Sequence, residues 1–172
     1  MIATTMQRIK PPESHYVNAA QGWLELGLPD EATAELDQLS DGWQVHPDVL
    51  EVRWAIVATQ KRWDVALELA TELVQIAPGR PTGWLHRAYA LRRAPQGGLK
   101  QAWNALLPAA DRFPKEALIP YNLSCYACQM QRLSDARAWL RRAIAAGNGE
   151  HVKQMALQDQ DLQPLWNEIQ DW

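Results

Sequence analysis

The sequence predicts an all-α protein built from about four helical hairpins and a C-terminal helical segment. Two observations support this fold class: a short pattern returns about every 34 residues, and apolar residues within each repeat recur at helical spacing. No segment alternates apolar and polar residues for long enough to indicate a strand. With 172 residues, of which 47% are hydrophobic, the chain can bury a core of its own.

The recurring pattern is a turn, then an acidic or polar residue, then an alanine two positions on. It places Ala32, Ala66, Ala102 and Ala136 at separations of 34, 36 and 34 residues. Each alanine opens a helical stretch that ends about twelve residues later near a proline or glycine. Because a small side chain lets two helices approach each other, we expect these alanines to mark where the helices of each hairpin cross.

The first two hairpins follow from apolar stripes at positions i, i+3, i+4 and i+7. Residues 13–46 carry the stripes Tyr16, Ala19, Ala20, Trp23 and then Ala32, Leu36, Leu39. Residues 47–80 carry Leu50, Trp54, Val57 and then Trp63, Ala66, Leu69, Ala70, Leu73. Gly27 suits a left-handed helix cap, and Pro47 suits the first turn of a helix.

The next two hairpins follow from the same spacing. Residues 81–115 carry Trp84, Ala88, Leu91 and then Ala102, Leu106, Ala109, and residues 116–147 carry Leu123, Ala127, Met130 and then Ala136, Leu140, Ala143, Ile144. The loop 93–98 supplies the two residues that lengthen the third repeat. Pro108 interrupts a helical pattern, so we expect a kink there.

The last segment, residues 148–172, does not repeat the pattern. It predicts a helix over 150–157, a turn at Asp159-Gln160-Asp161 and a short helix from Pro164. Its apolar residues are Leu162, Leu165, Trp166 and Ile169. A stacked array needs a terminal element with one apolar and one polar face, so we expect a cap. Residues 1–12 are expected to form an N-terminal extension.

The repeats resemble the tetratricopeptide repeat (TPR) family, whose unit is 34 residues in two antiparallel helices. The matching residues are Trp84, Ala88, Leu91, Ala102, Leu106 and Pro114, with Leu123, Ser124, Ala127, Ala136 and Leu140, and with Ala20, Trp23, Ala32 and Leu36. Arg53, Trp54 and Arg87 depart from the family pattern. The resemblance covers about residues 12–147 and implies a right-handed α-solenoid with repeats 13–46, 47–80, 81–115 and 116–147.

In this family the first helix of each repeat lines a concave groove that binds a peptide or helix of a partner protein. The resemblance therefore implies a non-catalytic interaction module, or scaffold, whose groove residues are Gln21, Glu25, Glu51, Tyr89, Arg92, Arg93, Tyr121, Cys125 and Gln129. Among them, Tyr89 and Tyr121 are the expected aromatic anchors, and Arg92 or Arg93 is expected to pair with an acidic group. A self-assembling structural protein, such as a homodimer, is the alternative.

Two short motifs could carry chemistry. Cys125 and Cys128 form a C-x-x-C, but it lies within a helical pattern and the four histidines are scattered, so small helix residues are the simpler interpretation and a thiol or metal role the rarer one. Asp159 and Asp161 form a D-x-D, which we interpret as helix capping. The chain shows none of the phosphate-loop, zinc-protease or serine-hydrolase motifs, so we expect no catalysis, metal or cofactor.

Charge and hydropathy limit the partners. Seventeen Lys and Arg against twenty Asp and Glu give a net charge of −3, which argues against a nucleic-acid partner. No apolar run is long enough to span a membrane, and no signal peptide is evident at the N-terminus, so we expect a cytoplasmic protein with reduced thiols. The nine tryptophans are expected mostly in the core. Trp43 and Trp172 lie outside the repeat stripes and are either exposed contacts or helix-end covers.

Overall fold

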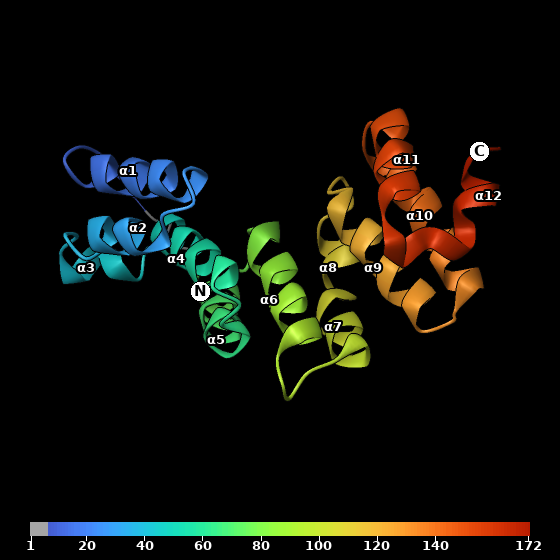
Figure 1. Cartoon of the computed structure of the whole chain (residues 1–172), viewed down its shortest axis with the longest axis horizontal. Helices are drawn as coiled ribbons and strands as arrows, with labels where there is room; N and C mark the ends of the chain where they lie inside the picture. Colours follow the sequence, from blue (N-terminus) through green and yellow to red (C-terminus); the bar gives the residue numbers. More distant parts are fainter. Residues whose placement is uncertain (1–6) are drawn as a thin grey trace. The chain divides into compact units, whose positions relative to one another are not determined.

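The computed structural model describes residues 7–172, and every regular element in that range is a helix (Figure 1). The chain divides into two compact units, Met1–Pro78 (unit 1) and Gly79–Trp172 (unit 2). Residues 1–6, half of the predicted N-terminal extension, lie outside the described range. The all-helical fold class predicted from the sequence is confirmed.

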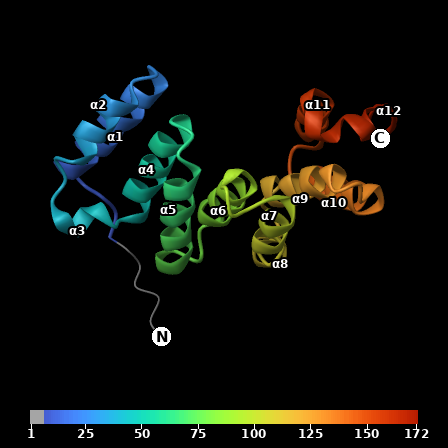
Figure 2. The same cartoon turned by 60° about the horizontal axis from the view of Figure 1, so that its bottom comes forward.

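Unit 1 contains two helical hairpins joined by a short helix. The first hairpin pairs α1 (Glu13–Glu25) with α2 (Pro29–Leu36), and the second pairs α4 (Pro47–Thr59) with α5 (Trp63–Ile76) (Figure 2). Helix α3 (Asp41–Gln44) connects them. Pro29 and Pro47 are each the first residue of their helix, where the missing N–H removes no intrahelical bond.

The core of unit 1 is formed by the facing stripes of α1, α2 and α4. Its buried residues are Ile9, Val17, Ala20, Ala32, Leu36, Leu39, Val49, Val52 and Ile56. The N-terminal segment contributes Ile9 to this core. It also contacts buried His46, which precedes α4: the Nε2 of His46 lies 3.0 Å from the backbone oxygen of Gln7. Trp43 packs against the same core as a partly buried side chain, so it is not a fully exposed contact residue.

Three of the hairpin turns have the same backbone geometry. Gly27, Lys61 and Gln131 each take a positive φ, of 75°, 57° and 62°. In each turn the next N–H bonds the carbonyl five residues back, as in Leu28 to Trp23 and Arg132 to Ala127 at 2.9 Å. This pair of features is the Schellman cap, which ends one helix and starts the next in a fixed direction.

Unit 2 begins with two further hairpins. The first pairs α6 (Pro81–Arg93) with α7 (Leu99–Leu106), which is followed by α8 (Ala109–Arg112). The second pairs α9 (Leu118–Gln129) with α10 (Leu133–Ala146). The helical pattern stops between Leu106 and Ala109 because Pro108 has no N–H, which is the interruption expected from the sequence.

The α6–α7 turn is longer than the others and depends on two glycines. The N–H of Gly98 bonds the carbonyl of Leu91 at 2.8 Å, and Gly98 has a φ of 139°. A Cβ on Gly97 would lie 1.8 Å from that same Leu91 oxygen. Because no other residue fits so close to the backbone, this pair accommodates the two-residue insertion of the third repeat.

The C-terminal segment folds back onto unit 2. It consists of α11 (Gly149–Gln158), the 3₁₀ helix η1 (Gln160–Leu165) and α12 (Trp166–Ile169). Helix α11 packs on α10, whereas η1 packs on α9. Leu162, Leu165 and Ile169 are fully buried in the core that α9 and α10 form. Trp172 also packs there, with the Arg141 guanidinium 4.8 Å from its ring.

None of the described helices combines the length and the apolar character that a membrane span needs.

The alanines at the hairpin crossings are all fully buried. Ala32, Ala66, Ala102 and Ala136 have 0% exposure, and the Ser124 hydroxyl donates to the Ala136 carbonyl at 2.8 Å across the α9–α10 crossing. There is therefore no room for a larger side chain between the paired helices.

We predict that Ala136→Leu destabilises the protein by about 1–3 kcal/mol, because the added methylene groups force α9 and α10 apart. Urea unfolding followed by circular dichroism measures this change. Ala138→Leu, at an exposed position of the same helix, is the matched control and should leave stability within about 0.5 kcal/mol of wild type. Equal stability of the two variants would contradict the close crossing.

Candidate functional site

The nine groove residues expected from the sequence fall on the first helix of each hairpin. Gln21 and Glu25 lie exposed on α1, and Glu51 lies on α4, all in unit 1. The other six lie in unit 2, on α6 and α9: Tyr89, Arg92, Arg93, Tyr121, Cys125 and Gln129. Four of those six converge on the C-terminal segment, at Asp159 and Asp161.

Arg92 forms the strongest of these contacts. Its two terminal nitrogens bond the two carboxylate oxygens of Asp161, and the Nη2–Oδ1 distance is 2.8 Å. This hydrogen bonding raises the pKa of Arg92 above its ordinary value. The side chains are 23% and 24% exposed, so water reaches the pair. A bidentate Arg–carboxylate bond of this kind fixes both position and orientation.

Tyr121 and Cys125 both donate to Asp159. The Tyr121 hydroxyl lies 3.0 Å from Oδ2 of Asp159, and the Cys125 Sγ lies 3.5 Å from the same oxygen. Burial raises the pKa of each donor, and the carboxylate raises it further. Both groups therefore remain protonated and act as hydrogen-bond donors near neutral pH.

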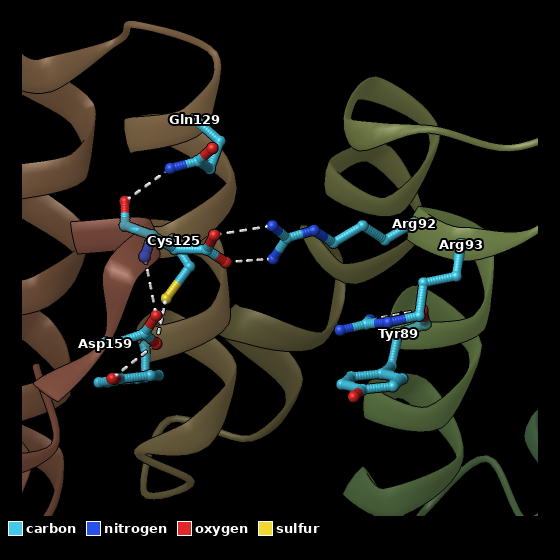
Figure 3. Close-up of polar contacts among 8 residues, drawn as sticks. Tyr89, Arg92, Arg93, Cys125, Gln129 and Asp159 are labelled. Atoms are coloured by element: carbon cyan, nitrogen blue, oxygen red, sulfur yellow. Dashed lines mark hydrogen bonds and ion pairs between the residues drawn. The ribbon is translucent and has the colours of Figure 1, made fainter. Parts of the chain in front are cut away.

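Gln129 completes a stripe along α9. Tyr121, Cys125 and Gln129 are spaced at i, i+4 and i+8, so they share one helix face. The amide of Gln129 donates to the backbone oxygen of Asp161 at 3.0 Å (Figure 3). Since the first two residues contact Asp159 and the third contacts Asp161, the segment runs along α9 in the same direction as the helix. We call Arg92, Tyr121, Cys125 and Gln129 the segment-binding face.

Tyr89 and Arg93 lie on α6 outside that face. Arg93 folds back over the Tyr89 ring, with its guanidinium 3.4 Å from the ring centroid, and donates to the Tyr89 backbone oxygen at 3.1 Å (Figure 3). Tyr89 is 38% exposed. An exposed aromatic–arginine pair of this type is common at protein contacts. Tyr121, the other expected anchor, is buried and instead holds the C-terminal segment.

Asp159 and Asp161, which the sequence pattern assigned only to capping, are the residues that four of the expected groove side chains contact. Capping does occur, since the Asp159 side chain accepts from the N–H of Asp161 at 2.9 Å and begins η1. The same carboxylate also accepts from α9. The D-x-D was visible in the sequence, but its partner Arg92 lies 69 residues away. No local pattern connects positions that far apart.

The two cysteines lie on the same helix, three residues apart. Both are reduced and buried within α9, and burial raises the pKa of each thiol. Cys125, Asp159 and Asp161 offer ligand atoms within 4.8 Å of one another. In the folded chain the Asp161 carboxylate of this group is bonded to the Arg92 guanidinium, and the Asp159 carboxylate accepts from Tyr121 and Cys125.

We predict that a thiol reagent such as 5,5′-dithiobis(2-nitrobenzoate) labels neither cysteine of the native chain at pH 8 within an hour. In the native chain, burial and the raised pKa of each thiol limit formation of the reactive thiolate. Unfolding in guanidinium chloride removes both effects, so both thiols should then react within seconds. The absorbance of the released nitrothiobenzoate measures the reaction. Fast labelling of the native chain would instead favour a thiol role for Cys125 and Cys128.

Comparison with known proteins supports the fold. A solved structure titled "MamA 41-end from Desulfovibrio magneticus RS-1" matches with a TM-score of 0.67 and 16% sequence identity, covering 95% of this chain and 96% of that one. MamA contains tetratricopeptide repeats, so the chain has a TPR-like helical repeat fold. The scan of protein-family models and the search of curated proteins found no match.

Proposed function

We propose that this chain is a non-catalytic interaction module, whose first-helix surfaces bind a peptide or helix of a partner protein. One observation carries the proposal: α6 and α9 hold the start of the C-terminal 3₁₀ turn, Asp159 and Asp161, through side chains at four positions where the repeat alignment places ligand contacts. The TPR-like fold is consistent with this use. The bound stretch belongs to the chain itself, so it serves as a guide to the chemistry of the surface.

The outer part of this surface is exposed. Tyr89 and Arg93 present an aromatic ring and a guanidinium on the exposed side of α6, and Leu118 at the start of α9 is 44% exposed. Aromatic and arginine side chains contribute most of the binding energy at typical interfaces. We therefore assign the first partner contacts to Tyr89 and Arg93.

We predict that Tyr89→Ala with Arg93→Ala reduces partner recovery at least tenfold. The immobilised chain is incubated with lysate of the cell that makes it, and bound proteins are quantified by mass spectrometry. Lys100→Ala with Gln101→Ala, exposed on α7, is the matched control and should recover the same partner as wild type. A partner retained equally by all three baits would contradict the assignment to α6.

Self-association is the second candidate, and the charge distribution favours it. Residues 1–78 contain five Lys and Arg against twelve Asp and Glu, whereas residues 79–172 contain twelve against eight. The two units therefore carry opposite net charges. The acidic unit of one copy could attract the basic unit of another, in a head-to-tail contact.

If that contact forms, sedimentation velocity should show dimers or larger species at about 20 mM salt and monomers at about 0.5 M salt, because salt screens exposed charges. Glu25→Gln, Glu31→Gln and Glu68→Gln together should weaken association at low salt, since all three are exposed in unit 1. Glu150→Gln with Asp171→Asn, exposed in unit 2, should not weaken it. A monomer at every salt concentration excludes this candidate.

A further inference from the structure

The segment Asp159–Leu162 is bound to unit 2 in the manner of a peptide ligand. Asp159 has extended backbone angles, φ −89° and ψ 112°, before the chain enters η1. Its carboxylate meets two donors from α9, and the next carboxylate, Asp161, meets a guanidinium from α6. Leu162 then enters the apolar core. The segment is thus recognised by two charges and one apolar side chain.

The segment-binding face is complementary to carboxylates. Each of its four side chains donates hydrogen bonds to the segment, and in this contact none of them accepts one. Arg92 is also held by the Tyr126 ring, whose centroid lies 5.7 Å from the guanidinium carbon. A face of fixed donors at the spacing of two carboxylates selects acidic segments over neutral or basic ones.

We infer that the segment-binding face is the site for an acidic partner peptide with the pattern Asp-x-Asp-Leu. This inference rests on the proposed function. The chain's own Asp159–Leu162 is the built-in occupant that such a peptide displaces. The carboxylates and the leucine of the incoming peptide make the same contacts that Asp159, Asp161 and Leu162 give up.

Tethering determines how the site behaves. A segment attached to its own site is present at an effective concentration in the millimolar range, so it competes strongly with any free peptide. If the site is open only one-hundredth of the time, the apparent affinity for a partner falls a hundredfold. Weakening the internal contact should therefore reveal the site.

The probe is a fluorescein-labelled synthetic peptide with the sequence of residues 158–166, measured by fluorescence anisotropy against the full-length protein at low salt. We expect Asp159→Asn with Asp161→Asn to bind it at least tenfold more tightly than wild type. Asparagine keeps the size and the capping oxygen of aspartate but loses the charge that holds Arg92. Adding Arg92→Gln to that variant should remove the gain.

Two controls make the result specific. The same peptide with asparagine at both aspartate positions should bind at least tenfold more weakly. Asp171→Asn removes an exposed carboxylate of the C-terminal segment and leaves the contacts of Asp159 and Asp161 with the face in place. This variant should bind like wild type. An equal gain in it, or equal binding of both peptides, would overturn the proposal.

Hydrogen exchange gives a second measurement that needs no variant. In the wild-type chain, the amides of residues 159–169 should lose protection when the peptide is present at several millimolar, while those of α10 should not. Unchanged protection would show that the segment is only a permanent cap. Partner capture through Tyr89 and Arg93 does not depend on this result, so the proposed function and this inference can fail separately.

Discussion

The close crossing of paired helices at buried alanines is the constraint on which the rest of this structure depends. Ala32, Ala66, Ala102 and Ala136 each sit at 0% exposure where a second helix begins to cross the first. Because no side chain separates the backbones there, the larger residues on either side interlock and set the crossing. The Schellman turns at Gly27, Lys61 and Gln131 then start the second helix of each of these hairpins in the same direction relative to the first.

That geometry fixes which side chains of α9 are turned away from α10. Once α9 has turned Ser124 and Ala127 toward α10, its opposite stripe carries Tyr121, Cys125 and Gln129. Tyr121 and Cys125 are buried against the apolar core, where a polar group without a partner is unfavourable, whereas Arg92 is partly buried and Gln129 is exposed. The C-terminal segment satisfies them with two carboxylates and one carbonyl, and it also buries Leu162 and Leu165.

Much of the fold follows from local sequence. The alanine spacing and the apolar stripes predict the hairpins because a helix places residues three and four apart on one face. Pro108 predicts an interruption because a proline cannot donate. The repeat alignment also named Arg92, Tyr121, Cys125 and Gln129 together as expected groove residues, and all four contact the C-terminal segment. These inferences need only the chain within one or two turns of each residue.

The partners of that surface could not be predicted in the same way. The C-terminal segment has no repeat register, so its return onto α9 depends on the angle at which α11 leaves α10. Arg92 and Asp161 are 69 residues apart, and their sequence neighbours are ordinary for an exposed arginine and a capping aspartate. Only the folded chain places the two charges together.

In the folded chain Arg92 is supplied with an anion by Asp161. Arg92 is only 23% exposed, and a guanidinium removed from water to that degree is stabilised by a carboxylate that bonds it in two places. A surface built to hold carboxylates therefore tends not to stay empty, and the nearest source is the chain's own terminus. The chain's own segment and an acidic segment of a partner are then bound through the same chemistry. Which of the two prevails depends on the effective concentration of the tethered segment against the concentration of a competing acidic one.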